Sequence, residues 1–144
     1  MTMEENKALL RQFYDEVINR GNLGMIEKAT AANIVDHSLA PGLPPGVEGV
    51  KQWFGMMRKA FPDARVTVND ILGEGDKVVT RVTLRGTHKG EFLGVPATGK
   101  PVSIEGIDIS RFSGGKLVEH WGQFDALGLM QQLGAVPPPG KPSK

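Results

Sequence analysis

Two carboxylates, an amide and an indole alternate with other residues in the last third of the chain. Residues 102–112 and 116–125 have the composition of two β-strands, and residues 113–115 between them are typical of a tight hairpin turn. Because side chains two residues apart share a face of a strand, one face is expected to carry Asp108, Trp121, Gln123 and Asp125. Polar groups on a covered face cost about 1–3 kcal/mol each if unpaired. This face therefore predicts a cavity that holds water or a ligand.

The facing of this hairpin follows from pairing Phe112 with Leu117 across the short loop. The opposite face then carries a largely apolar set: Ile107, Ile109, Val118, His120 and Phe124. A sheet that is apolar on both faces needs a cover on each. Helices would cover one face, and a second copy of the chain is the simplest cover for the other. A register error of a single residue would exchange the two faces.

The absence of cysteine restricts the side chains available for chemistry. Thiol nucleophiles, disulfides, cysteine-ligated zinc and iron–sulfur clusters are excluded, so a reaction must use carboxylate, imidazole or hydroxyl groups. The histidines are His37, His88 and His120, and no ligand pair has a recognised metal-binding spacing. We therefore predict no metal, and the glycine-rich loops show no phosphate-binding pattern.

Helical periodicity dominates the first half of the chain. Residues 4–20 place apolar side chains three and four apart on one broad face, and Gly21 ends this helix. A shorter helix is expected over 22–31 and a third over 48–61. Between them, residues 40–47 hold too many prolines for a helix or a central strand and predict an ordered surface loop.

The second half changes to the two-residue period of β-strands. Residues 65–72 and 77–88 are expected to form a hairpin that precedes the one described above, and strand parity puts His88 on the inner face. A short last helix follows. Three helices and then a meander of antiparallel strands define an α+β fold of one domain, residues 1–134, with a loose tail rich in proline and lysine over 135–144.

Length and charge restrict the class of partner. With 144 residues, 17 basic and 16 acidic side chains and a formal net charge of +1, the chain offers no electrostatic basis for binding nucleic acid or a membrane surface. No apolar run approaches the roughly 18 residues of a membrane-spanning helix, and no signal sequence precedes the first helix. We therefore expect a cytoplasmic protein that binds a small, largely apolar molecule.

Short motifs follow one another along almost the whole chain up to Gly134. They are Phe13-Tyr14, Asn19-Arg20-Gly21, Asp36-His37, Gly49-Val50, Phe61-Pro62-Asp63, Gly75 to Val78, Gly86 to Gly99, Gly115-Lys116, Glu119 to Trp121 with Asp125, and Gln132-Leu133-Gly134. In their order and spacing they resemble the SnoaL-like polyketide cyclase (ester cyclase) family of the nuclear-transport-factor-2-like superfamily. This resemblance implies a cone-shaped α+β barrel, in which three N-terminal helices pack on a curved antiparallel sheet around a deep pocket. It also implies a homodimer through the outer sheet face, in agreement with the apolar outer face predicted above.

The resemblance further implies an enzyme of the cyclase or isomerase kind. Such an enzyme closes a ring of a polyketide ester by intramolecular aldol chemistry and uses no cofactor. Asp125 matches the family's general acid/base, and His37 matches a pocket histidine that helps to hold the substrate. An apolar pocket makes a carboxylate a stronger base, because desolvation disfavours its charged form. The expected substrate-binding side chains are His88, Asp108, Trp53, Trp121 and Gln123.

These residues also have structural interpretations. Asp125 precedes the last helix and could cap it, with or without a chemical role. His37 could be a turn residue, and His88 could be structural at the end of its strand. His120 is expected at the interface between subunits rather than in the site. Trp53 and Trp121 could be core residues, and the sequence pattern would be the same if they formed the wall of a pocket.

Two other functions fit the same fold, because a fold does not decide function. One is a non-catalytic protein that binds a small apolar molecule in the pocket. The other is a hydrolase or dehydratase that acts on a small hydrophobic substrate. The epoxide-hydrolase variant of this fold uses an Asp-Arg-Asp constellation. Here Arg81 and Arg111 both fall on the predicted outer face, which counts against this variant.

Overall fold

The computed structural model describes residues 1–137 and residue 140. Its helical elements are α1 (Met3–Phe13), the π-helical segment η1 (Tyr14–Asn19), α2 (Met25–Ala29), α3 (Val47–Ala60) and α4 (Ala126–Leu133). Its strands are β1 (Thr30–Asp36), β2 (Arg65–Glu74), β3 (Lys77–Thr87), β4 (Pro101–Ser113) and β5 (Lys116–Phe124). Helices and antiparallel hairpins thus occupy the segments where periodicity predicted them, which confirms the α+β class.

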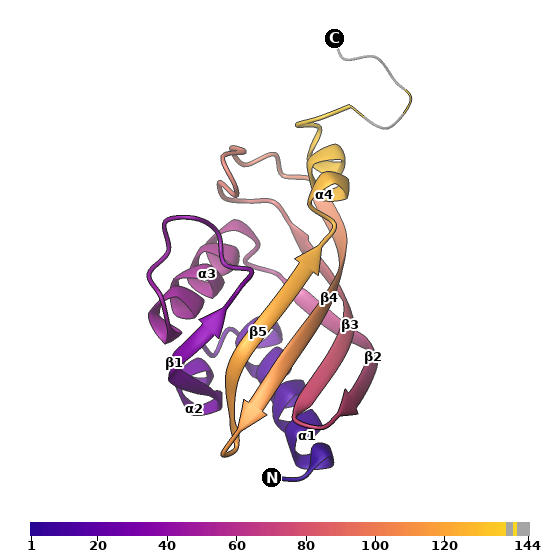
Figure 1. Ribbon diagram of the computed structural model, residues 1–144. Helices are drawn as coiled ribbons and strands as arrows, with labels where there is room; N and C mark the ends of the chain where they lie inside the picture. Colours follow the sequence, from indigo (N-terminus) through magenta and orange to yellow (C-terminus); the bar gives the residue numbers. More distant parts are fainter. Residues whose placement is uncertain (138–139, 141–144) are drawn as a thin grey trace.

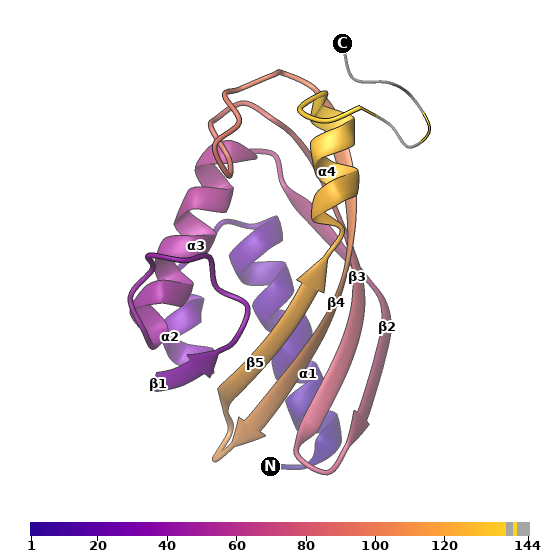
Figure 2. The same ribbon diagram turned by 45° about the horizontal axis from the view of Figure 1, so that its top comes forward.

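The framework is a five-stranded sheet with the strand order β1-β5-β4-β3-β2. Helices α1, α2 and α3 lie on one side of this sheet (Figure 1). The turned view shows the sheet curving around α1, with α4 beyond the end of β5 (Figure 2). The buried apolar side chains of the helices and of the inner sheet face form one core cluster. The hydrophobic core therefore lies between these two layers.

The first helix begins where predicted and then widens. The side chain of Thr2 caps α1 by accepting a hydrogen bond from the backbone N–H of Glu5 at 3.2 Å. From Tyr14 onward the backbone is π-helical, and the N–H of Arg20 donates to the carbonyl of Asp15, five residues earlier, at 3.0 Å. Such segments are frequent at functional sites. Here the segment begins at a residue of the cavity wall described below.

The sheet contains a strand that the sequence analysis did not predict. The second helix, expected over 22–31, ends at Ala29, and Thr30 begins β1, which pairs with β5 in parallel. The expectation of a purely antiparallel sheet is therefore wrong, and the sheet is mixed. The burial of β1 lacks the alternation typical of a strand. The strand exists because β5 offers it hydrogen-bonding groups, and just beyond it the N–H of His37 donates to the carbonyl of His120 at 2.9 Å.

The pairing of β4 with β5 contains a bulge. Phe112 lies opposite Leu117, as predicted, but Arg111 lies opposite Glu119, so Val118 is an extra residue in β5. One extra residue reverses which side chains of a strand point inward.

The bulge overturns the predicted facing of β5. Asp108 lies on the inner face, as expected, but His120 and Phe124 share that face with it. Trp121 lies on the outer face, where the ammonium of Lys77 lies 5.4 Å from the centroid of its ring. The prediction that put Trp121 inside and His120 outside is therefore wrong, and its cause is the extra residue in the strand.

The remaining expectations concern the ends and surroundings of the fold. None of the helices in the part of the chain that the structure describes is long and apolar enough to cross a membrane. The cytoplasmic location stays a prediction. The expected loose tail over 135–144 lies for the most part outside the described residues.

Candidate active site

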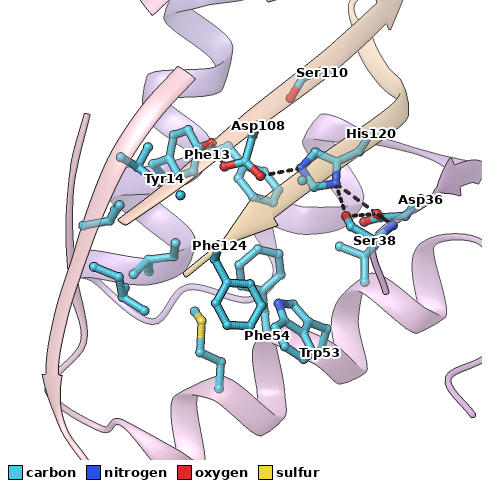
Figure 3. A pocket seen from close by; sticks show the side chains of 18 of the residues that line it. Phe13, Tyr14, Asp36, Ser38, Trp53, Phe54, Asp108, Ser110, His120 and Phe124 are labelled. Carbon is cyan, nitrogen blue, oxygen red and sulfur yellow. Dashed lines mark hydrogen bonds and ion pairs between the residues drawn. The ribbon is translucent and has the colours of Figure 1, made fainter. Parts of the chain in front are cut away.

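A cavity of about 380 Å³ lies between the helices and the inner face of the sheet (Figure 3). This volume falls in the range of sites for small organic molecules. Most of the wall is apolar and comes from both layers of the fold. Its apolar side chains include Leu10, Phe13, Trp53, Phe54, Met57 and Leu117.

The cavity has an open end and a closed end. Near the beginning of β4 and the end of β5, its lining residues Glu105, Phe124 and Ala126 are exposed. At the other end, the lining residues Leu10 and Leu117 are buried. Strand β4 thus runs from the mouth of the cavity to its floor.

A polar network interrupts the apolar wall near its centre (Figure 3). His120 Nδ1 lies 2.9 Å from Oδ1 of Asp36, and His120 Nε2 lies 3.0 Å from Oδ1 of Asp108. The hydroxyl of Ser38 donates to the same Asp36 oxygen at 2.8 Å. Because each ring nitrogen faces a carboxylate, both nitrogens act as donors and the ring is an imidazolium.

The charge state of the network follows from its burial and its hydrogen bonds. Burial alone would lower the pKa of His120, but the hydrogen bonds to Asp108 and Asp36 and their charges outweigh it and raise the pKa to about 9. Burial acts to raise the pKa of Asp36, whereas the hydrogen bond and charge of His120 and the hydrogen bonds from Ser38 bring it below its ordinary value. Asp36 and His120 therefore form an ion pair at neutral pH.

A second branch of the network reaches the helical layer through Tyr14. The Tyr14 hydroxyl donates to Oδ2 of Asp108 at 3.1 Å and lies 2.8 Å from the hydroxyl of Thr80. Burial, and after it the charge of Asp108, raises the pKa of Tyr14 above its ordinary value, so the phenol keeps its proton. Asp108 thus accepts hydrogen bonds from η1 and from β5, which fix its carboxylate at the cavity wall.

The network requires a residue without a side chain at position 122. Gly122 is the direct partner of Asp108 on β5. A Cβ atom at Gly122 would lie 2.5 Å from Oδ1 of Asp108 and 3.0 Å from Cε1 of His120. The glycine therefore leaves the room in which the carboxylate and the imidazolium meet.

Three of the predicted site residues line the cavity. Asp108 lies at its polar centre, Trp53 contributes to the wall from α3, and Gln123 borders the exposed mouth. Gln123 is the direct partner of Ile107, so its side chain belongs to the outer face and not to the predicted inner face, because of the same bulge. The ring of Trp53 packs against that of Phe92, with the centroids 5.6 Å apart.

Asp125 does not line the cavity. It is exposed and is the N-cap of α4, where its Oδ1 accepts a hydrogen bond from the backbone N–H of Gly128 at 2.8 Å. The capping interpretation is confirmed. The acid/base role implied by the resemblance stays a prediction.

His37 and Trp121 meet outside the cavity, with their rings stacked at 5.0 Å and nearly parallel. His37 Nε2 lies 2.7 Å from Glu119, which also accepts a hydrogen bond from Arg111 at 2.9 Å. The hydrogen bond with His37 and then that with Arg111 lower the pKa of Glu119. The structure does not bring His37 or Trp121 to the lining of the cavity.

His88 is fully buried, as strand parity predicted, but it does not line the cavity either. Its ring lies 5.6 Å from that of Phe61. Its Nδ1 accepts a hydrogen bond from the backbone N–H of Thr98 at 3.2 Å. His88 therefore holds the loop that follows β3.

Sequence reasoning missed five members of the network, Asp36, Ser38, Tyr14, Thr80 and His120. Asp36 and Tyr14 lie in motifs of the family resemblance, but nothing local in the sequence marks them as cavity residues. The one available signal was the parity of β5: shifting it by a single residue brings His120 to the face of Asp108.

The network is not a metal site. Among residues 1–137 and 140, no group of three or more histidine and acidic side chains is arranged to hold a metal ion. Both ring nitrogens of His120 are engaged with carboxylates. The arrangement offers a carboxylate base, an imidazolium and a phenol to a molecule in the cavity.

A curved sheet under helices, an apolar cavity with an exposed end and a carboxylate–imidazolium pair in its wall define a small-molecule pocket protein with acid/base groups. A family model described as SnoaL-like polyketide cyclase matches residues 8–133. The chain therefore belongs to the SnoaL-like polyketide cyclase family, as the motifs predicted.

Similarity to individual proteins agrees with this family. The chain is 31% identical to the nogalonic acid methyl ester cyclase of Streptomyces nogalater over 98 residues, which cover 67% of this chain and 73% of that protein. Its fold is similar to the solved structure of TsrD from Streptomyces laurentii, with 29% identity, a TM-score of 0.87 and coverage of 94% and 99% of the two chains. It is also similar to AclR from Streptomyces galilaeus, with 34% identity, a TM-score of 0.84 and coverage of 97% and 87%.

Proposed function

We propose that this protein is an ester cyclase that closes a ring in a small hydrophobic, polyketide-like ester by an intramolecular aldol reaction. The observation that carries the proposal is the position of the Asp108 carboxylate. It is held by His120 and Tyr14 in the wall of an otherwise apolar cavity. The similar protein of S. nogalater is named for a methyl ester cyclase activity, which supports the same substrate class here.

Asp108 is the base in the proposed reaction. A carbon between two carbonyl groups is acidic enough to give its proton to a well-placed carboxylate. The enolate carbon then attacks a carbonyl carbon of the same molecule, a C–C bond forms, and the carbonyl oxygen becomes an alkoxide. Protonated Asp108 returns the proton to this oxygen, which gives the aldol hydroxyl and restores the carboxylate. Protons and electrons balance within the substrate and this one side chain.

His120 acts as a fixed positive charge beside the base. Its Nε2–H occupies one side of the Asp108 carboxylate, and its imidazolium stabilises negative charge that develops on substrate oxygens nearby. Asp36 holds the far side of the ring, which keeps the imidazolium oriented and charged. A charge built into the wall needs no reorganisation at the moment of reaction.

The charges of the network also support an ester rather than a free acid as the substrate. Asp36 and Asp108 contribute two negative charges and His120 one positive charge, so the network carries a net charge of −1. A ligand carboxylate would be desolvated next to this charge, which is unfavourable in an apolar cavity. An ester of the same acid avoids that cost.

The test is turnover of nogalonic acid methyl ester, the compound in the name of the S. nogalater relative, or of aklanonic acid methyl ester, followed by chromatography of the cyclised product. The second compound is in the name of a cyclase of Streptomyces peucetius that is 40% identical to this chain over 60 residues. Asp108→Asn should lower kcat by about 10²–10⁴, because it removes the base at nearly constant shape. Asp70→Asn is the matched control, since it removes a carboxylate from an exposed pair with Arg81 and should leave turnover intact. Binding of either ester by the wild type without any turnover would favour a non-catalytic pocket protein.

Asp125→Asn separates this proposal from the assignment that the resemblance implies. Asparagine also caps helices well, so the variant should keep the stability of α4. If Asp125→Asn abolishes turnover while Asp108→Asn keeps it, the base is Asp125 and the assignment to Asp108 is wrong.

We also propose that a second copy of the chain covers the outer sheet face. In support, the apolar side chain of Ile107 is 54% exposed on this face and lies beside the half-buried Ile109 and Trp121. Sedimentation should show a dimer, and Ile107→Asp should shift it to the monomer. A monomeric wild type would contradict this proposal without affecting the site.

A further inference from the structure

We infer that Ser110 is a specificity-determining residue that binds a second oxygen of the substrate near the floor of the cavity. The inference rests on the proposed cyclase function, because it concerns the same cavity. Ser110 lines this cavity and is only 1% exposed. It follows Asp108 by two residues on β4, so both side chains are on the inner face (Figure 3). Residues two apart on a strand are about 7 Å apart along it.

Ser110 lies deeper than the reacting centre. Along β4, Gly106 lines the cavity near the mouth, Asp108 lies at its centre and Ser110 comes next. Beyond Ser110, the buried pair of Phe112 and Leu117 closes this end of the sheet. A molecule that presents its reacting group to Asp108 from the mouth therefore extends its far edge toward Ser110.

The hydroxyl of Ser110 lies outside the hydrogen-bond network of the cavity wall. The hydrogen bonds of the surrounding network join Tyr14, Thr80, Asp108 and His120, and Ser110 takes part in none of the side-chain hydrogen bonds formed by residues 1–137. Its partner on β3 is the fully buried, apolar Val78. In a mostly apolar wall, this hydroxyl can form a hydrogen bond with a ligand, which alanine could not do.

A buried hydroxyl without a hydrogen-bond partner lies at the same end of the cavity. Thr30 lies opposite Leu117, lines the cavity and is 2% exposed. Its Oγ1 lacks a hydrogen-bond partner among the described residues. Among the described residues that line the cavity, hydroxyl groups outside the charged network are therefore found at the floor.

The ligand class follows from this spacing. One oxygen belongs to the reacting carbonyl or enol at Asp108, and the other is a hydroxyl or carbonyl about 7 Å away, on the far edge of an apolar ring system. A fused pair of six-membered rings carries oxygens at about this separation, whereas a single ring is too short. Substrates that lack the distal oxygen should bind, but more weakly.

The experiment measures affinity rather than turnover. Isothermal titration calorimetry compares 2,6-dihydroxynaphthalene, which has an oxygen at each end, with 2-naphthol, which has one. The wild type should bind the diol about 3–10-fold more tightly, as expected for one neutral hydrogen bond. Ser110→Ala should remove this preference and leave the affinity for 2-naphthol unchanged. Ser103→Ala, an exposed serine of the same strand, should keep the preference.

Each outcome decides the inference. It is overturned if the wild type binds both probes equally, if Ser110→Ala keeps the preference, or if both affinities fall together. Thermal unfolding of each variant checks that the fold is retained, and Ser110→Cys supplies a second variant of similar size with a weak donor. Because the readout is binding, a failure of ester turnover would overturn the proposed reaction while leaving this result to stand.

Discussion

His120 and Asp108 lie on adjacent strands in a diagonal contact, with Nε2 and Oδ1 3.0 Å apart. Asp108 pairs directly with Gly122, and His120 pairs directly with Ser110. Diagonal neighbours on a sheet are farther apart than direct partners, so they meet only through long side chains and across an empty position. The contact therefore depends on the missing side chain of Gly122 as much as on the two charged groups.

Gly122→Ala should separate the pair. The added Cβ would lie 2.5 Å from Oδ1 of Asp108, so the carboxylate must move. A displacement of about 1 Å can cost about 100-fold in rate, and we expect a loss of kcat of this order in ester turnover. Gly55→Ala on α3 is the control, since its Cβ would meet no atom within 4 Å. Equal activity of both variants would show that the contact does not matter for the reaction.

Asp36→Asn should lower the pKa of His120 from about 9 toward its ordinary value of 6.5. The variant removes one of the two carboxylates that hold the proton on the ring. An NMR titration of the His120 ring protons measures the change. Asp70→Asn serves as the control and should leave the titration where it is. An unchanged pKa in Asp36→Asn would mean that Asp108 alone keeps the ring charged.

The stability of the fold should depend on pH through His120. The pKa of this group is raised on folding, so its stabilising effect is complete below about pH 6.5 and is lost as the pH rises toward 9. The full effect is on the order of 3 kcal/mol. Urea unfolding should give the wild type a larger free energy of unfolding than His120→Gln at pH 6, and this difference should disappear at pH 9.5. A constant difference between the two proteins would contradict the ion-pair description.

Tyr14→Phe should lower both stability and turnover. Removing the phenol leaves the hydroxyl of Thr80 buried and unpaired, which costs about 1–3 kcal/mol, and frees one side of Asp108. Adding Thr80→Val should restore much of the stability, because it removes the unpaired hydroxyl. Turnover should stay low in the double variant, since the contact with Asp108 is still missing. Recovery of both properties would assign Tyr14 a purely structural role.

Much of the fold could be predicted because it is encoded locally. Apolar spacing predicted the helices over residues 4–20 and 48–61, which the structure contains as α1 with η1 and as α3. The pair Gly114-Gly115 indicated a hairpin turn. The inward position of Asp108 was likewise predicted from strand period and confirmed. Each of these features depends on residues that are neighbours in the chain.

The rest was decided by contacts between distant segments. Strand β1 exists because β5 offers it a pairing edge, and that pairing brings Asp36 opposite His120. The extra residue Val118 reverses the faces of β5, so the histidine expected at an interface lies in the cavity wall. The chain's composition and periodicity determined an α+β pocket protein without thiol chemistry. Which carboxylate meets which imidazole depends on strand register, and a bulge leaves no local signal because it changes pairing without changing composition.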